Sequence, residues 1–255
     1  MRRSALFAVP LVLLAAGAFA VAAAGGDRAD AVDPAAANAR TARASSVHYA
    51  VTVTLTERKQ PLTLHISGGS SRDALSVRLR LDELKTKDGG TVPGADTTVR
   101  ALGPFLYERA PDALSQVLGK VRWLRLSTDG LSSRSQTMSA LRALTPSSLY
   151  RVVAETRLRA VGTDGAFAGP VAYDDPVVVT ALNRLTGGLQ FRSLRVGVQV
   201  GRDGLVHRVR IDGRTADGAS TLRLRARLYG FGRPVEVVPP KPGTFVDRGL
   251  QQLQS

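Results

Sequence analysis

The sequence of 255 residues contains no cysteine, and this absence excludes several kinds of chemistry. Without a thiol the chain forms no disulfide, has no cysteine nucleophile and holds no cysteine-ligated zinc or iron–sulfur centre. Histidine is scarce as well, with three in the chain, so few side chains can transfer a proton near neutral pH. Stability must therefore come from packing and hydrogen bonds.

Acidic residues are also in short supply. The chain has 35 lysines and arginines against 21 aspartates and glutamates, which is a formal net charge of +14, and arginine supplies 30 of the basic side chains. Because arginine codons are rich in G and C, a nucleotide-composition bias produces the same skew. The net charge does not by itself identify a polyanionic partner.

The motifs of common enzymes are missing too. The chain has no G-x-x-x-x-G-K-[ST] phosphate loop, and no G-x-S-x-G elbow precedes a predicted helix. The glycines of Gly230-Phe231-Gly232 are followed by Arg-Pro at the end of a predicted strand, which indicates a bend rather than a dinucleotide loop. Asp174-Asp175 precedes Pro176, where helix capping explains the carboxylates better than acid–base catalysis. We expect no enzymatic activity, no cofactor and no metal.

Residues 1–24 predict export. They combine two arginines, an uncharged apolar run and a small-x-small end at Ala22-Ala23-Ala24, as a signal peptide does. The uncharged span is also close to the ~20 residues that cross a bilayer, so an uncleaved N-terminal anchor is the alternative. Pro10 and Gly17 favour cleavage. In both cases the protein lies outside the cytoplasm, in the cell envelope or periplasm, and without cysteine it is not a lipobox lipoprotein.

The rest of the chain divides into three parts. Residues 25–45 carry Val32 as their one large aliphatic side chain and predict a flexible linker. Residues 46–248 show no internal boundary and predict a single domain, and residues 249–255 form a short tail. We expect a monomer.

Alternation of apolar and polar residues predicts most of that domain to be β-structure. Val47, Tyr49, Val51, Val53 and Leu55 fall on one side of a half-buried strand. The same pattern predicts further strands over 62–66, 75–81, 98–109, 121–127, 189–200, 205–213, 220–231 and 234–238. Short helices are predicted between 135 and 155, divided by Pro146, and over 177–185. The fold class is therefore α+β, a meander of about ten antiparallel strands with few helices.

Two of these strands place arginine at every second position. The side chains that share the polar face are Arg78, Arg80, Arg223, Arg225 and Arg227. A solvated sheet face is one interpretation, and a face attracted to anionic phospholipid is another, since several basic side chains near a charged leaflet act together. Nucleic acid is not expected, because aromatic residues are not interleaved with the arginines and the chain is exported.

The opposite, apolar face indicates a function more directly than the arginines do. A strongly curved sheet of about ten strands presents more apolar surface than two or three short helices cover, which is the geometry of a hydrophobic cavity. Four segments then resemble, in order, motifs of the LppX/LprG-type envelope lipoproteins of actinobacteria, relatives of the LolA-like carriers: FLYERAPDALSQVLGKVRWLRLS, GTDGAFAGPVAY, VGRDGLVHRVRID and LYGFGRPVEVVPPKPGTFVD.

This resemblance implies a half-barrel closed by helices, whose cavity binds lipids or acylated molecules for transport through the envelope. From alternation, the residues expected to line the cavity are Tyr49, Val51, Val53, Leu64, Ile66, Val77, Leu79, Leu81, Phe105, Tyr107, Leu194, Val196, Val198, Val209, Ile211, Leu222, Leu224 and Leu228. The alternative is an envelope sensor or structural domain on the same scaffold, which contacts a protein partner and fills its interior with its own side chains.

Overall fold

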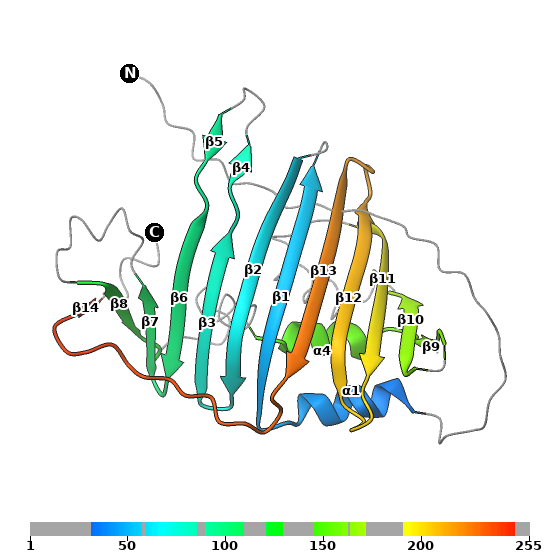
Figure 1. Ribbon diagram of the computed structural model, residues 1–255, viewed down its shortest axis with the longest axis horizontal. Helices are drawn as coiled ribbons and strands as arrows, with labels where there is room; N and C mark the ends of the chain where they lie inside the picture. Colours follow the sequence, from blue (N-terminus) through cyan, green and yellow to red (C-terminus); the bar gives the residue numbers. More distant parts are fainter. Residues whose placement is uncertain are drawn as a thin grey trace.

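The computed structural model describes residues 32–57, 60–85, 90–109, 121–129, 145–162, 164–171 and 191–247. The predicted signal or anchor over 1–24, the first of the two helices predicted between 135 and 155, the predicted helix over 177–185 and the tail over 249–255 lie outside these residues. The described part is an α+β fold built on one large antiparallel sheet with two short helices (Figure 1).

Twelve strands form the large sheet, in the order β14-β8-β7-β6-β3-β2-β1-β13-β12-β11-β10-β9. Their bounds are β1 Ser46–Glu57, β2 Gln60–Ser71, β3 Ala74–Leu81, β6 Ala95–Leu102, β7 Phe105–Arg109, β8 Trp123–Ser127, β9 Arg159–Ala160, β10 Ala166–Pro170, β11 Phe191–Val200, β12 Val206–Thr215, β13 Ser220–Tyr229 and β14 Phe245–Asp247. A small hairpin, β4 Leu84–Lys85 with β5 Thr91–Val92, stands apart from it.

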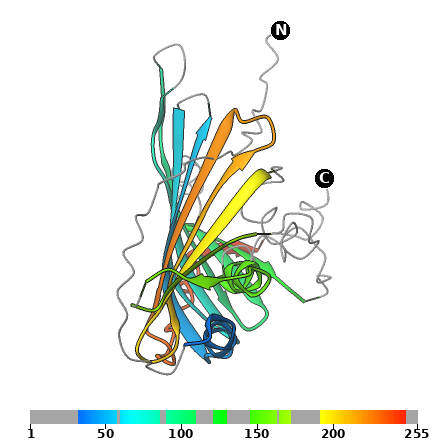
Figure 2. The same ribbon diagram turned by 90° about the vertical axis from the view of Figure 1, so that its right-hand side faces the viewer.

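The sheet consists of two meanders joined at its centre. One runs from β1 to β8 and the other from β9 to β13, and they meet where β1 pairs with β13. All neighbours are antiparallel except β14, which lies parallel to β8. Because β14 and β9 are separate edges, the sheet is open, and it is visibly curved when seen from the side (Figure 2). The predicted meander is confirmed within each half.

Tight turns between the strands depend on glycine. Gly103 joins β6 to β7 with φ +54°, and Gly218 joins β12 to β13 with φ +70°. A residue with a side chain is strained at such angles, whereas glycine is not. The weak strand predicted over 98–109 is therefore two strands with a turn at Gly103-Pro104.

Both helices lie on the same face of the sheet (Figure 2). Helix α4, Ser147–Ala154, follows Pro146 as predicted and buries Leu149, Val152 and Val153. Helix α1 spans Pro34–Ala42. Asp33 directly precedes it, and the Asp33 side chain accepts a hydrogen bond from the Ala35 N–H at 2.9 Å. Asp33 is thus the N-cap, and the proline stands in the first turn, where its missing N–H costs nothing.

Helix α1 corrects the prediction of a flexible linker over 25–45 for its part from residue 32 on, whereas residues 25–31 lie outside the described residues. Its buried side chains are small or polar, so it joins the fold without a large aliphatic residue. Asn38 donates a hydrogen bond to the Tyr150 carbonyl of α4 at 2.9 Å. Thr41 Oγ1 donates to the Ala37 carbonyl at 2.7 Å and accepts from the Val206 N–H of β12 at 2.8 Å. Specific hydrogen bonds therefore attach α1 to both α4 and the sheet.

The predicted final strand over 234–238 is also wrong. Residues 230–244, which we call the C-terminal strap, run along one end of the sheet, on the face opposite the helices, to reach β14 (Figure 1). Arg100 donates to the Val238 carbonyl at 2.7 Å, and the Thr244 carbonyl accepts from Trp123 N–H at 3.1 Å. The strap crosses strand ends rather than pairing along one strand. The edge strands β9 and β14, and β10 beside β9, were not predicted.

Replacing Thr41 tests whether α1 belongs to the fold. Thr41→Val keeps the shape of the side chain but leaves the buried Val206 N–H without its acceptor, so we expect the free energy of unfolding to fall by about 1–3 kcal/mol. Thr41→Ser keeps the oxygen and serves as the control. Urea denaturation followed by circular dichroism measures both; equal stability of the valine variant and the wild type would contradict the role of α1.

Candidate functional site

The inner face, defined as the face that carries α1 and α4, is the apolar side of the sheet. Register places its side chains in rows, for example Val53, Leu224, Ile211 and Val196 across β1, β13, β12 and β11. Leu224, Ile211 and Val196 are 0% exposed. Strand alternation therefore delivers one continuous apolar face, as predicted.

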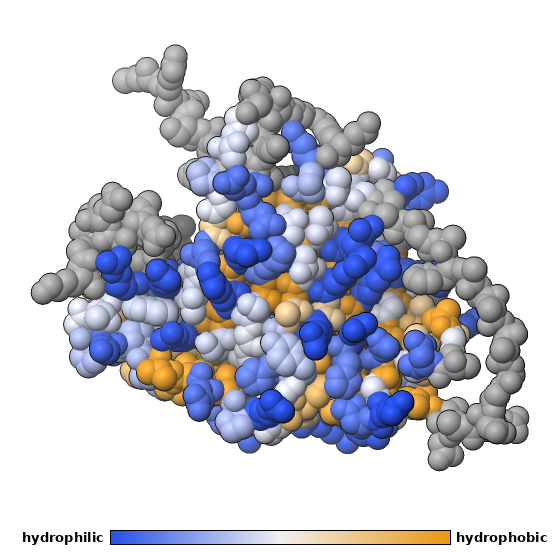
Figure 3. Space-filling model, in the orientation of Figure 1, coloured by the Kyte–Doolittle hydropathy of each residue, from blue (hydrophilic) through white to orange (hydrophobic). Residues whose placement is uncertain are grey.

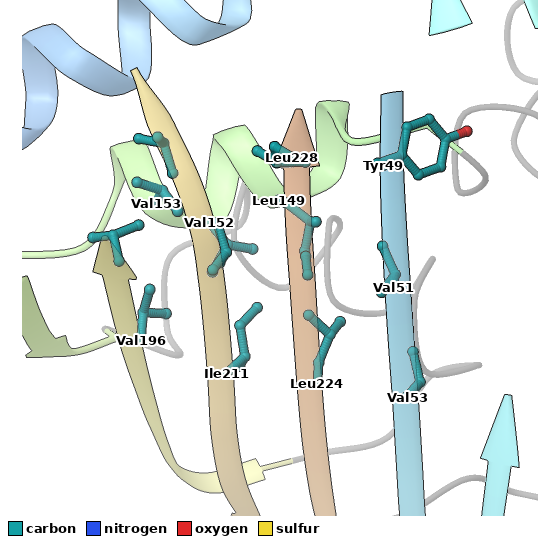
Figure 4. Close-up of a cluster of buried hydrophobic side chains, with 14 of the residues drawn as sticks. Tyr49, Val51, Val53, Leu149, Val152, Val153, Val196, Ile211, Leu224 and Leu228 are labelled. Carbon is teal, nitrogen blue, oxygen red and sulfur yellow. The ribbon is translucent and has the colours of Figure 1, made fainter. Parts of the chain in front are cut away.

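Helix α4 packs directly on this face (Figure 4). Leu149, Val152 and Val153 recur at i, i+3 and i+4 and project toward β11, β12 and β13, where Leu228 is also fully buried. Burial of each such side chain contributes about 1.5–3 kcal/mol. This part of the inner face is a packed core.

Two tyrosines add polar groups to the apolar layer. Burial raises the pKa of Tyr49 well above its usual range, with a further contribution from the neighbouring Tyr150, and burial also raises the pKa of Tyr150. Within the described part of the chain, the Tyr150 hydroxyl, Asn38 Oδ1 and Ser148 Oγ are buried without a hydrogen-bond partner. A buried polar atom without a partner costs about 1–3 kcal/mol, so these atoms are candidates for contact with a bound molecule.

Burial decreases toward the ends of β2 and β3. Leu64 lies between Val53 and Leu81 on the inner face, and Leu79 lies beside Ile66. Val53 is 1% exposed, whereas Leu62, Leu64, Leu79 and Leu81 are only half-buried. These four residues form what we call the leucine patch, a continuation of the core that is partly accessible.

The structure places sixteen of the eighteen predicted lining residues on the inner face. Phe105 and Tyr107 are the exceptions, and for them the prediction is wrong. Register aligns Tyr107 with Arg100 and Arg100 with Ser76, which is on the outer face, the side opposite the helices. The turn at Gly103-Pro104 pairs Leu102 with Phe105, and this pairing could have located both aromatic residues on the outer face.

Phe105 and Tyr107 belong instead to an aromatic cluster at the sheet edge. The Arg125 guanidinium lies 4.9 Å from the centre of the Phe105 ring and 4.4 Å from that of Phe245 in β14. Tyr107 meets Phe245 edge-on at 5.9 Å. Cation–π contacts of this kind hold β14 against the sheet.

The five predicted outer-face arginines all lie on the side of the sheet away from the helices, and hydrophilic residues spread over that side in Figure 3. Asp96 accepts from Arg78 Nε at 3.0 Å, and this contact lowers the pKa of the carboxyl and raises that of the guanidinium. Asp82 lies 3.5 Å from Arg80, and Asp212 lies 3.7 Å from Arg223.

The histidines occupy three separate places. His65 bridges Thr52 at 3.4 Å and Asp82 at 3.0 Å on the outer face, and His207 contacts Asp203 at 2.9 Å. His48 stacks on the Tyr229 ring. Among the described residues no three metal-ligating side chains come together. A search of the same residues finds no helix that is long and apolar enough to cross a membrane.

Comparisons with known proteins identify no family. No protein-family model matches the chain, and no curated protein matches it. A crystal structure of a DUF1329 family protein from Desulfovibrio piger aligns over 81% of this chain and 93% of its own, with 8% identity and a TM-score of 0.26. The dehydratase domain of the polyketide PpsC from Mycobacterium tuberculosis aligns over 71% and 74%, with 13% identity and a TM-score of 0.16. Likenesses this low carry no argument about fold or function.

Acid should weaken the attachment of β14 to the sheet. The hydrogen bonds from Arg125 hold the pKa of Asp247 below its ordinary value, so the folded state loses this stabilisation as pH falls below about 4 and the carboxylate is protonated. Trp123, the single tryptophan, pairs with Phe245 and reports the change by its fluorescence. The acid transition should be missing in Asp247→Asn; the same pH profile in both proteins would refute the link.

Proposed function

We propose that the protein is an exported carrier of the cell envelope, which binds the acyl chains of lipids or lipidated molecules against the inner face of its sheet. Residues 1–24 supply the export signal, and the open curved sheet supplies the binding surface. The role is transport or transfer without catalysis.

The leucine patch carries this proposal. Leu62, Leu64, Leu79 and Leu81 extend the apolar surface beyond its tightly packed centre, and their side chains keep part of their surface accessible. An acyl chain laid on them gains about 0.8 kcal/mol for each methylene removed from water. A chain of ordinary length would therefore bind with useful affinity without a specific polar contact.

Two further features agree with a bound lipid. The Tyr150 hydroxyl and Asn38 Oδ1 are buried polar atoms near the apolar layer, and a ligand with a hydroxyl or carbonyl group could satisfy them. The order of the four sequence motifs resembles that of the LppX/LprG-type proteins, for which lipid carriage is the implied activity.

A second candidate function is an envelope sensor or structural domain that contacts a protein partner and carries no ligand. It is favoured by the complete burial of Leu222, Leu224, Leu228, Ile211 and Val196, which are packed by protein atoms. On this interpretation the inner face is a core, and the leucine patch is its margin.

Protein purified from its native host distinguishes the two candidates. Solvent extraction followed by mass spectrometry should recover lipid in a stoichiometric amount if the protein is a carrier. Protein that is folded, free of lipid and unable to take up a fluorescent fatty acid would exclude the carrier and leave the second candidate.

Two adjacent substitutions on β2 locate the binding surface. Leu64→Gln puts an amide into the leucine patch and should weaken uptake of a fluorescent fatty acid by about tenfold or more, since it removes apolar contact and adds a polar group. Thr63→Gln lies next to it on the outer face, opposite Thr54, and should bind as the wild type does. Equal loss in both variants, or in neither, would argue against the patch as the site.

A further inference from the structure

Arginines face one another across the centre of the outer face. Arg208 of β12 is directly opposite Arg227 of β13, and Arg210 is directly opposite Arg225 in the next row on the same side. Like charges in this cross-strand position destabilise a sheet. We call these four residues the arginine ladder. Because its charges repel one another, the ladder does not help β12 and β13 to pair.

Acidic residues on the same face neutralise little of the ladder's positive charge. On strands β11, β12 and β13 the outer face has one carboxylate, Asp212, and seven arginines: Arg195, Arg208, Arg210, Arg214, Arg223, Arg225 and Arg227. Asp212 contacts Arg210 and lies 3.7 Å from Arg223. Among the described residues, no carboxylate lies within 4.0 Å of Arg208, Arg225 or Arg227.

The other half of the sheet differs. Arg78 is paired with Asp96, and Arg80 lies 3.5 Å from Asp82. These two arginines of β3 each have an acidic partner, Asp96 on the neighbouring β6 and Asp82 just after β3. The excess positive charge is concentrated over β12 and β13, within the hydrophilic surface seen in Figure 3.

The surroundings of the ladder leave its guanidinium groups accessible. The residues beside it on β1 and β11 are uncharged: Ala50, Thr52, Gly197 and Gln199. Arg208, Arg225 and Arg227 are exposed. Guanidinium groups in adjacent rows of two strands can each form paired hydrogen bonds with a phosphate.

We propose that the arginine ladder docks the protein on the surface of a membrane rich in anionic phospholipid. A bilayer supplies many phosphates in one plane, which several guanidinium groups on two neighbouring strands can contact together. Nucleic acid fits less well, because the nearby aromatic ring of Tyr229 is already stacked on His48 and lies 5.7 Å from the Arg227 guanidinium. Docking uses the face opposite the proposed lipid-binding face, so it goes beyond the proposed function. Either proposal can be wrong without affecting the other.

Vesicle sedimentation of the full exported chain tests the proposal. The protein should bind vesicles of phosphatidylglycerol and phosphatidylcholine, bind phosphatidylcholine alone much less, and lose the difference at high salt. In Arg208→Gln/Arg225→Gln/Arg227→Gln, binding to the anionic vesicles should fall by roughly two orders of magnitude. The control Arg43→Gln/Arg151→Gln/Arg157→Gln removes equal charge on or beside α1 and α4, and should lose much less.

Thermal unfolding of the same variants separates docking from structure. Removing repulsion across the ladder should leave the Tm of the free protein unchanged or raise it, although vesicle binding is lost. Equal losses of binding in both triple variants would show that only net charge matters and would overturn the site. Tight binding of single-stranded DNA in place of anionic vesicles would overturn the choice of membrane. Fatty-acid uptake should be unaffected by the ladder substitutions.

Discussion

The antiparallel pairing of β1 with β13 holds the whole sheet together, because it is where the first and last long strands of the domain meet. Leu55, Val53 and Tyr49 are opposite Leu222, Leu224 and Leu228, and all six are nearly or fully buried. Each half of the sheet is a meander of local hairpins, but only this long-range pairing makes one continuous apolar face. The helices then have a surface wide enough to pack on.

The same pairing determines the outer face. Between the buried residues of β13 stand Arg223, Arg225 and Arg227, opposite Thr54, Thr52 and Ala50. A shift of register by one residue would place three arginines in the core and the leucines in water. Burying three unpaired charges would cost more free energy than the folded state has in reserve. The arginines therefore specify the register by excluding the alternative, in addition to any role they have in docking.

Local pattern was enough to predict elements whose burial is strictly periodic, such as β13, β3 and α4. It failed where a residue's neighbours come from distant parts of the chain. Helix α1 buries Ala37, Asn38 and Thr41, so it has no strong apolar period, although Asp33-Pro34 is the same kind of start signal that was recognised at Asp175-Pro176. Residues 234–238 alternate like a strand, but they pair with no strand among the described residues and form part of the strap instead.

The functional site was predictable in one respect and unpredictable in another. Alternation along each strand separated the inner-face residues from the arginines correctly, except after the Gly103-Pro104 turn, where the hairpin register had to be counted. Charge compensation could not be read in this way, because Asp96 reaches Arg78 from another strand. A codon bias would raise the number of arginines, but it would not place the acids beside β3 and leave β12 and β13 with facing arginines. That uneven distribution is a property of the fold, and it identifies which arginines of a basic protein are available to a partner.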